Sequence, residues 1–100
     1  MRCGLVVMAE SRESSRAFLV WLSRQAHQPD PLEFLATTDG VGMMPGDLEH
    51  LVVQLHGLGL VSCDGWRAEG RLPCRVSLRS PGWHCLEAFG ADVTAWAAAR

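Results

Sequence analysis

The side chains in this sequence that are best suited to bind a soft metal ion lie in its second half. Cys63 and Cys74 fall on two adjacent predicted strands, and His84 and Cys85 follow shortly after them. Four such ligands would suit zinc, but their spacings match no zinc motif, and a neighbouring His and Cys cannot easily converge on one ion. We therefore predict buried, inert thiols here, with no metal and no cofactor. Cys3, near the start of the sequence, is expected to be the exposed thiol that oxidises most easily.

The sequence also lacks the patterns that accompany catalysis. It contains no nucleophile elbow, phosphate-binding loop or HExxH motif. His50 and His56 are six residues apart, so they do not share one face of a helix. Asp30 and Glu33 are accounted for by the start of a predicted helix, and His27 by the end of another, where positive charge is favoured. We therefore predict that the chain is not an enzyme.

Arginine supplies all nine basic side chains, and its distribution is uneven. Residues 60–80 hold four arginines against two acidic residues, whereas residues 1–58 hold four against seven. Because arginine binds phosphate well, the four in the basic segment are candidate phosphate contacts. An ordinary solvated strand face explains them equally well, since a net charge of -2 is not that of a general polyanion binder. The candidates are Arg67, Arg71, Arg75 and Arg79.

The composition bounds what these residues can belong to. One hundred residues, 48% of them hydrophobic, predict a single globular domain with a real core. The apolar runs fall well short of the roughly 20 residues that a membrane helix needs. The first nine residues do not form a secretory signal, so we expect a cytoplasmic protein with reduced thiols. The absence of Lys, Ile, Asn and Tyr indicates a GC-rich bacterial genome rather than a chemical requirement.

Helical spacing of apolar residues predicts three helices in the first part of the chain. The first covers about residues 13–27, with Trp21 in the core, and residues 5–8 either extend it or form a short strand. The second covers about 31–38 and begins at Asp30-Pro31, a good capping pair. The third opens at Pro45-Gly46-Asp47, and Gly57 is predicted to lie just beyond its end at a positive φ.

Two strands and two more helices are predicted after these. Leu60–Trp66 and Leu72–Leu78 form a hairpin in which Cys74, Val76 and Leu78 point inward by period two. Ser80-Pro81 starts a helix with Trp83 in the core, Gly90 interrupts it, and Asp92–Ala99 resumes it. The last helix carries an apolar stripe that we expect a core of this size to leave uncovered, as a dimer or partner surface. The stripe consists of Val93, Trp96 and Ala97.

This order of elements and two stretches of sequence carry a resemblance to a known family. Asp47-Leu-Glu-His-Leu-Val-Val-Gln-Leu-His-Gly-Leu-Gly-Leu-Val61 looks like a third helix that runs into a first wing strand. Val76-Ser-Leu-Arg-Ser-Pro-Gly-Trp-His-Cys-Leu86 looks like the junction between a second wing strand and a closing helix. The chain resembles small bacterial winged helix-turn-helix proteins, in the broad manner of the MarR and PadR groups, over residues 13–90.

The resemblance implies an α+β fold with three helices, a two-stranded β-wing and a C-terminal helix. Residues 1–12 would then be an N-terminal arm, 13–90 the winged-helix domain, and 91–100 a helical extension suited to dimerisation. It also implies a dimeric, DNA-binding transcriptional regulator whose third helix lies in the major groove. On that reading the third helix exposes Asp47, Glu49, His50, Val53, Gln54 and His56.

Within this face, Gln54 would read an adenine edge, and His50 would donate to guanine or phosphate. The four wing arginines would bind phosphate. However, Gly46 stands where such families often carry Ser or Thr, Asp47 and Glu49 add negative charge, and residues 30–66 contain no Arg or Lys. The alternative is therefore a winged helix that binds another protein and no DNA, through the third helix or the stripe around Trp96.

Overall fold

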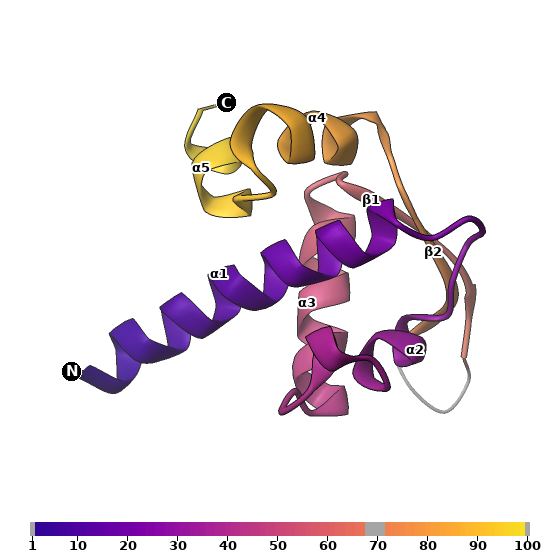
Figure 1. Ribbon diagram of the computed structural model, residues 1–100, viewed down its shortest axis with the longest axis horizontal. Helices are drawn as coiled ribbons and strands as arrows, with labels where there is room; N and C mark the ends of the chain where they lie inside the picture. Colours follow the sequence, from indigo (N-terminus) through magenta and orange to yellow (C-terminus); the bar gives the residue numbers. More distant parts are fainter. Residues whose placement is uncertain (1, 68–71, 100) are drawn as a thin grey trace.

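The chain is described by a computed structural model that covers residues 2–67 and 72–99, with side chains from residue 12 onward except that of residue 39. Over these residues it is an α+β protein with five α helices, a short 3-10 helix and a two-stranded antiparallel sheet (Figure 1). The elements are α1 (Arg2–Ser23), α2 (Pro31–Leu35), η1 (Thr38–Gly40), α3 (Pro45–Gly57), β1 (Val61–Trp66), β2 (Pro73–Leu78), α4 (Ser80–Phe89) and α5 (Val93–Ala98).

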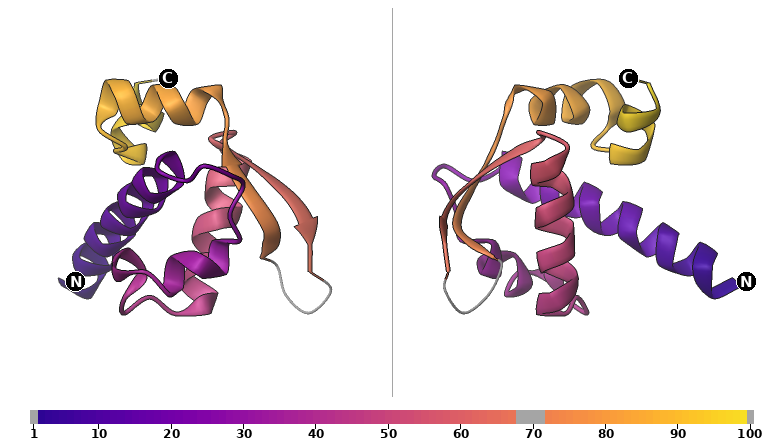
Figure 2. Two further views of the ribbon diagram at one scale, coloured as in Figure 1. Left: turned by 45° about the vertical axis from the view of Figure 1, so that its right-hand side comes forward. Right: turned by 180° about the vertical axis from the view of Figure 1, so that it is seen from behind.

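The helices pack around α1, and the hairpin stands beside α3. Helices α4 and α5 lie at one end of the molecule and α2 at the other, while the first half of α1 extends past the remaining helices (Figures 1 and 2). Strand β1 packs on α3, and β2 contacts α1 and α2. None of the helices in the described residues combines the length and apolar character that a membrane crossing requires.

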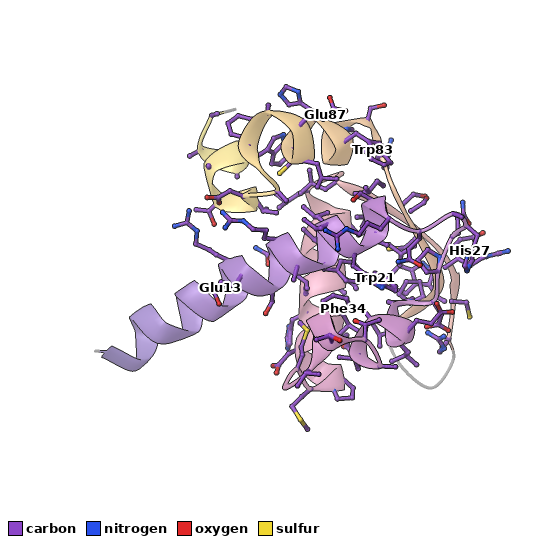
Figure 3. All side chains as sticks on the ribbon, viewed as in Figure 1. Glu13, Trp21, His27, Phe34, Trp83 and Glu87 are labelled. Carbon is purple, nitrogen blue, oxygen red and sulfur yellow. The ribbon has the colours of Figure 1, made fainter. Side chains whose placement is uncertain are left out.

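The centre of the core is an aromatic cluster between α1 and α2. The ring centroids of Phe18 and Trp21 are 5.7 Å apart, and Phe34 packs edge-on against both at 5.0 and 5.4 Å. Trp21 is therefore in the core, as the helical spacing predicts (Figure 3). Helix α3 adds its inner face, and the strands add Val61 and Val76. The inner face of α3 consists of Leu48, Leu51, Val52 and Leu55.

The first helix is longer at its start and shorter at its end than predicted. It is continuous from Arg2, so the polar residues 11–15 lie inside the helix and do not cap it. It ends at Ser23 rather than near residue 27. Ser23 Oγ donates to the carbonyl of Val20 (2.6 Å), and Gln25 Nε2 donates to that of Trp21 (3.0 Å), so polar side chains occupy carbonyls at the end of the helix.

The second helix begins as predicted and ends early. The Asp30 carboxylate accepts the Leu32 backbone N–H at 2.8 Å, and Pro31 occupies the first turn. The helix stops at Leu35 instead of continuing to about residue 38. The Thr37 hydroxyl donates to the carbonyl of Phe34 at 2.7 Å, and the chain then forms η1.

The third helix begins at Pro45 as predicted, but the residue with a positive φ after it is not Gly57. Gly57 is the last residue of α3, and the left-handed turn falls at Gly59 (φ 79°). The turn is closed by the Leu60 backbone N–H, which donates to the carbonyl of Leu55 at 3.0 Å. The helix therefore runs one residue further than the glycine pattern indicates before the chain enters β1.

The hairpin is confirmed within one residue at the strand ends, but one of its predicted inward residues is wrong. Strand β2 pairs with β1 in the register Cys63–Val76 and Asp64–Arg75. Val76 is buried as predicted, whereas Cys74, two residues nearer the turn, is exposed. Across from Cys74 stands Gly65, which has no side chain to cover it. The period of two predicts the face of the strand, but it does not show how far the helices cover that face.

The two other predictions about tryptophan are reversed by the structure. Trp83, predicted to lie in the core, is 45% exposed at the start of α4 (Figure 3). Val93 and Trp96, predicted to form an uncovered stripe, are 7% and 6% exposed. Of that stripe, Ala97 alone is exposed, because α5 packs on α1 and α4. The stripe is core, so it does not supply a dimer or partner surface.

Candidate functional site

The exposed side of α3 is a row of mostly uncharged side chains. Four exposed residues make up this row: His50, Val53, Gln54 and His56. Val53 lies three residues from each histidine, so it is a neighbour of both on the helix surface. This confirms that these residues face away from the core. Val53 is 47% exposed. A single exposed apolar residue is ordinary on a protein surface, so Val53 matters only together with its exposed neighbours.

The hairpin extends this row through one aromatic contact. The ring of Trp66, at the end of β1, meets the ring of His56 edge-on with centroids 5.9 Å apart, and Trp66 remains 49% exposed. Just before it, Gly65 has a φ of 68° and a hypothetical Cβ there would lie 3.1 Å from Cys74 Cβ. Both the positive φ and the close approach of Cys74 favour glycine at position 65, one residue before the end of β1. We call the exposed residues His50, Val53, Gln54, His56 and Trp66 the α3–hairpin surface.

Arg67, predicted as a phosphate contact near the tip of the hairpin, is fully engaged within the protein. Its Nη1 donates to the carbonyls of Pro73 (2.6 Å) and Leu72 (3.4 Å), and its Nη2 is paired with the carboxylate of Asp30. Its side chain is only 27% exposed. A phosphate would have to displace three acceptors, so the structure weighs against Arg67 as a phosphate contact, which stays a prediction.

The other candidate arginines differ from Arg67 and from one another. Arg75 is exposed and donates to the Asp64 carboxylate across the hairpin at 2.9 Å, a surface pair of the kind that contributes little to stability. Arg79 is exposed at the N-cap of α4 and has no ion-pair partner among the described residues. Arg71 lies outside the described residues. The basic segment 60–80 therefore presents less free positive charge than its composition indicates.

The thiols of the hairpin and α4 are spread over different environments. Cys85 is fully buried, and burial, with a smaller effect of the Asp92 carboxylate, raises the pKa of its thiol. Burial also raises the pKa of the Cys63 thiol to about 11. Both are therefore poor nucleophiles, as predicted for inert thiols. Cys74 is exposed, and the side chain of Cys3 lies outside the described ones. Among the side chains that the structure describes, those of residues 12–67 and 72–99 other than 39, no three of His, Cys, Asp or Glu gather so as to hold a metal ion.

Asp30 has a second role besides capping helix α2. Its second carboxylate oxygen also accepts from Arg67, 37 residues further along the chain. No local pattern signals such a contact, because it joins a loop before α2 to the turn end of the hairpin. Comparison with known proteins adds nothing to this picture, since no family model, curated protein or solved structure matches the chain.

Proposed function

We propose that the chain is a winged-helix module that uses the α3–hairpin surface to bind a partner protein. The order α1–α2–α3–β1–β2–α4 supports a winged helix, with the hairpin as its wing. The backbone N–H of Val76 in β2 also donates to the carbonyl of Pro29 at 3.1 Å, so the segment between α1 and α2 lies along the hairpin as a third-strand segment would. This supports the arrangement that the sequence resemblance implies.

The observation that carries protein binding is the chemistry of the exposed α3 side. It combines two half-exposed large apolar side chains, Val53 and Trp66, with the absence of any Arg or Lys between residues 30 and 66. Exposed Trp is typical of the anchors that dominate protein interfaces. Asp47, exposed in the first turn of α3, adds negative charge near this surface. The matching partner is a protein segment with an apolar anchor side chain and basic neighbours.

DNA binding is the second proposal, and a specific observation supports it. Gln54 and His50 lie exposed on α3, within one turn of each other, while Arg75 and Arg79 are exposed on and just after the hairpin. This is the arrangement needed to read base edges from the helix and to bind phosphate from the wing. It is the weaker proposal because Arg67 is withdrawn from the surface and Arg75 is already paired with Asp64.

A photo-crosslinking experiment in the native cell tests the leading proposal. Benzoylphenylalanine is introduced at Val53 and, as a matched control, at Thr94, which is exposed on α5. We expect one defined protein adduct at position 53, which disappears when Trp66→Ala is added and survives when Arg79→Ala is added. An adduct formed equally from position 94, or one indifferent to Trp66→Ala, would overturn the proposal.

The DNA proposal is tested in parallel by a salt-titrated binding assay on mixed genomic DNA. Binding at low salt that weakens in Arg75→Ala and Arg79→Ala, but not in Trp66→Ala, would make DNA the partner. No detectable binding at low salt would remove it. That the chain is dimeric and is not an enzyme stays a prediction, and the dimer now lacks the surface on α5 that was predicted for it.

A further inference from the structure

The side chain of Arg67 connects the hairpin to a part of the chain that is distant in sequence. Arg67 follows the last residue of β1, and its guanidinium donates to the carbonyls of Leu72 and Pro73, where the chain returns into β2. The same guanidinium is paired with Asp30. Arginine presents its donors as a planar fork, which is what allows one side chain to serve two carbonyls and a carboxylate together.

Asp30 is itself fixed to helix α2. One of its carboxylate oxygens accepts the Leu32 backbone N–H at 2.8 Å, which caps the helix, and the other accepts from Arg67. The preceding residue, Pro29, accepts the N–H of Val76 from β2 at 3.1 Å. The segment before α2 is therefore attached to the hairpin at two points, one by a side chain and one by the backbone.

This attachment bears directly on the proposed binding surface, because Trp66 is the residue next to Arg67. An isolated two-stranded hairpin is at best marginally stable, so the position of its exposed end depends on contacts with the helices. The Arg75–Asp64 pair lies within the hairpin and cannot fix the hairpin relative to α3. We propose that Arg67 is a positioning residue, which anchors the turn end of the hairpin to Asp30 and thereby holds Trp66 against His56.

The proposal deepens the proposed function, since it concerns the same surface, but it is tested without any partner. The full-length protein is labelled with 5-fluorotryptophan, and the Trp66 fluorine resonance is assigned from Trp66→Phe. Because the ring of Trp66 meets the ring of His56 edge-on, replacing His56 should move the Trp66 resonance. The displacement seen in His56→Gln therefore establishes the probe.

The variants Arg67→Ala and Asp30→Asn are then compared with Arg75→Ala as the matched control. We expect Arg67→Ala and Asp30→Asn to move the Trp66 resonance toward its position in His56→Gln, and Arg75→Ala to leave it unchanged. Amide exchange at Val76 should become about tenfold faster in Arg67→Ala, which corresponds to losing one charge-assisted attachment. Arg67→Lys should fall between, because an ammonium group can reach the carboxylate but cannot form the fork.

Two results would overturn this role for Arg67. One is a native Trp66 resonance and native Val76 exchange in both Arg67→Ala and Asp30→Asn. The other is the same loss in Arg75→Ala, which would mean that any missing charge disturbs the hairpin. If Arg67→Ala fails to fold, Asp30→Asn decides, since Asn still caps α2. Crosslinking that is indifferent to Trp66→Ala would refute the proposed function and leave these measurements standing.

Discussion

Replacing two tryptophans of this chain by alanine should have opposite consequences for folding and binding. Trp96 is 6% exposed between α5, α1 and α4, whereas Trp66 is 49% exposed on the hairpin. A fully buried tryptophan removes about 150–250 Å² from water, which at about 25 cal/mol per Å² is about 4–6 kcal/mol as an upper bound. Measured core truncations of this size cost about 3–5 kcal/mol. Trp66→Ala loses mainly one aromatic contact, about 0.5–1.5 kcal/mol.

Urea unfolding followed by far-ultraviolet circular dichroism measures both effects, because it does not depend on the deleted fluorophores. With a urea m-value of about 1.5 kcal/mol per M, Trp96→Ala should lower the midpoint by about 2–3 M and Trp66→Ala by less than about 1 M. Self-association of the folded fraction in sedimentation should not change in Trp96→Ala. A midpoint for Trp96→Ala no lower than that for Trp66→Ala would show that Trp96 is not core and would restore the α5 stripe as a partner surface.

Three further predictions concern single groups. Gly82→Ala should lower the melting temperature by about 5–15 °C, because the new Cβ would lie 2.3 Å from the carbonyl oxygen of Leu60. Gly57→Ala, which has open space around it, should raise the melting temperature. Equal melting temperatures for the two variants would contradict this reasoning. The backbone N–H of Ala95, which donates to Asp92, lowers the pKa of the Asp92 carboxyl, and the side chain of Arg12 lowers it further. The loss of stability in Asp92→Asn should therefore be complete at neutral pH and should vanish as the pH falls through that lowered pKa. A loss of stability that persists in strong acid would refute the role of the charge. Iodoacetamide should alkylate the exposed thiol of Cys74 faster than that of Cys63, because burial raises the pKa of the Cys63 thiol to about 11. Mass spectrometry after a short exposure at about pH 8 measures the order of alkylation. The reverse order would show that Cys63 is not buried.

Features set by neighbouring residues were predictable from the sequence. The start of α2 follows from Asp30-Pro31, where a carboxylate caps the helix and proline occupies its first turn. The start of α3 and both strands follow from equally local patterns. What these have in common is that the deciding groups lie within a few residues of one another, so propensity and capping suffice without knowledge of the tertiary structure.

The exposure of the tryptophans was not predictable, because it depends on how whole helices are placed. Trp83 and Trp96 both lie on apolar faces of short helices, and the sequence pattern does not rank them. The close approach of Gly82 to the Leu60 carbonyl turns Gly82 and Cys85 of α4 toward the interior, so that Trp83 points outward. Helix α5 has α1 and α4 to cover it, so its Trp96 is buried.

The α3 part of the candidate site was predictable in its residues, whereas Trp66 and the charge of the hairpin were not. Exposure of His50 and Gln54 follows from the helical spacing of the leucines of α3. The arginine count for residues 60–80 indicates a basic hairpin, but a count does not show which cations already have partners. Asp30 lies far away in the sequence and engages Arg67, and Asp64 pairs with Arg75. With Arg67 and Arg75 engaged in these pairs, the hairpin offers DNA less free positive charge than the count indicates.

The same contacts set a limit on how any DNA binding must depend on salt. Each phosphate contact contributes about -0.9 to the slope of log K against log salt. Arg75 and Arg79 together give about -1.8 per chain, and Arg71 would bring the slope to about -2.7. Arg79→Ala should therefore flatten the slope by about 0.9, whereas Arg67→Ala should leave it unchanged, because its guanidinium is held by Asp30 and two carbonyls. A flatter slope in Arg67→Ala would show that Arg67 leaves Asp30 for a phosphate, and the hairpin would then have to move away from α2 when DNA binds.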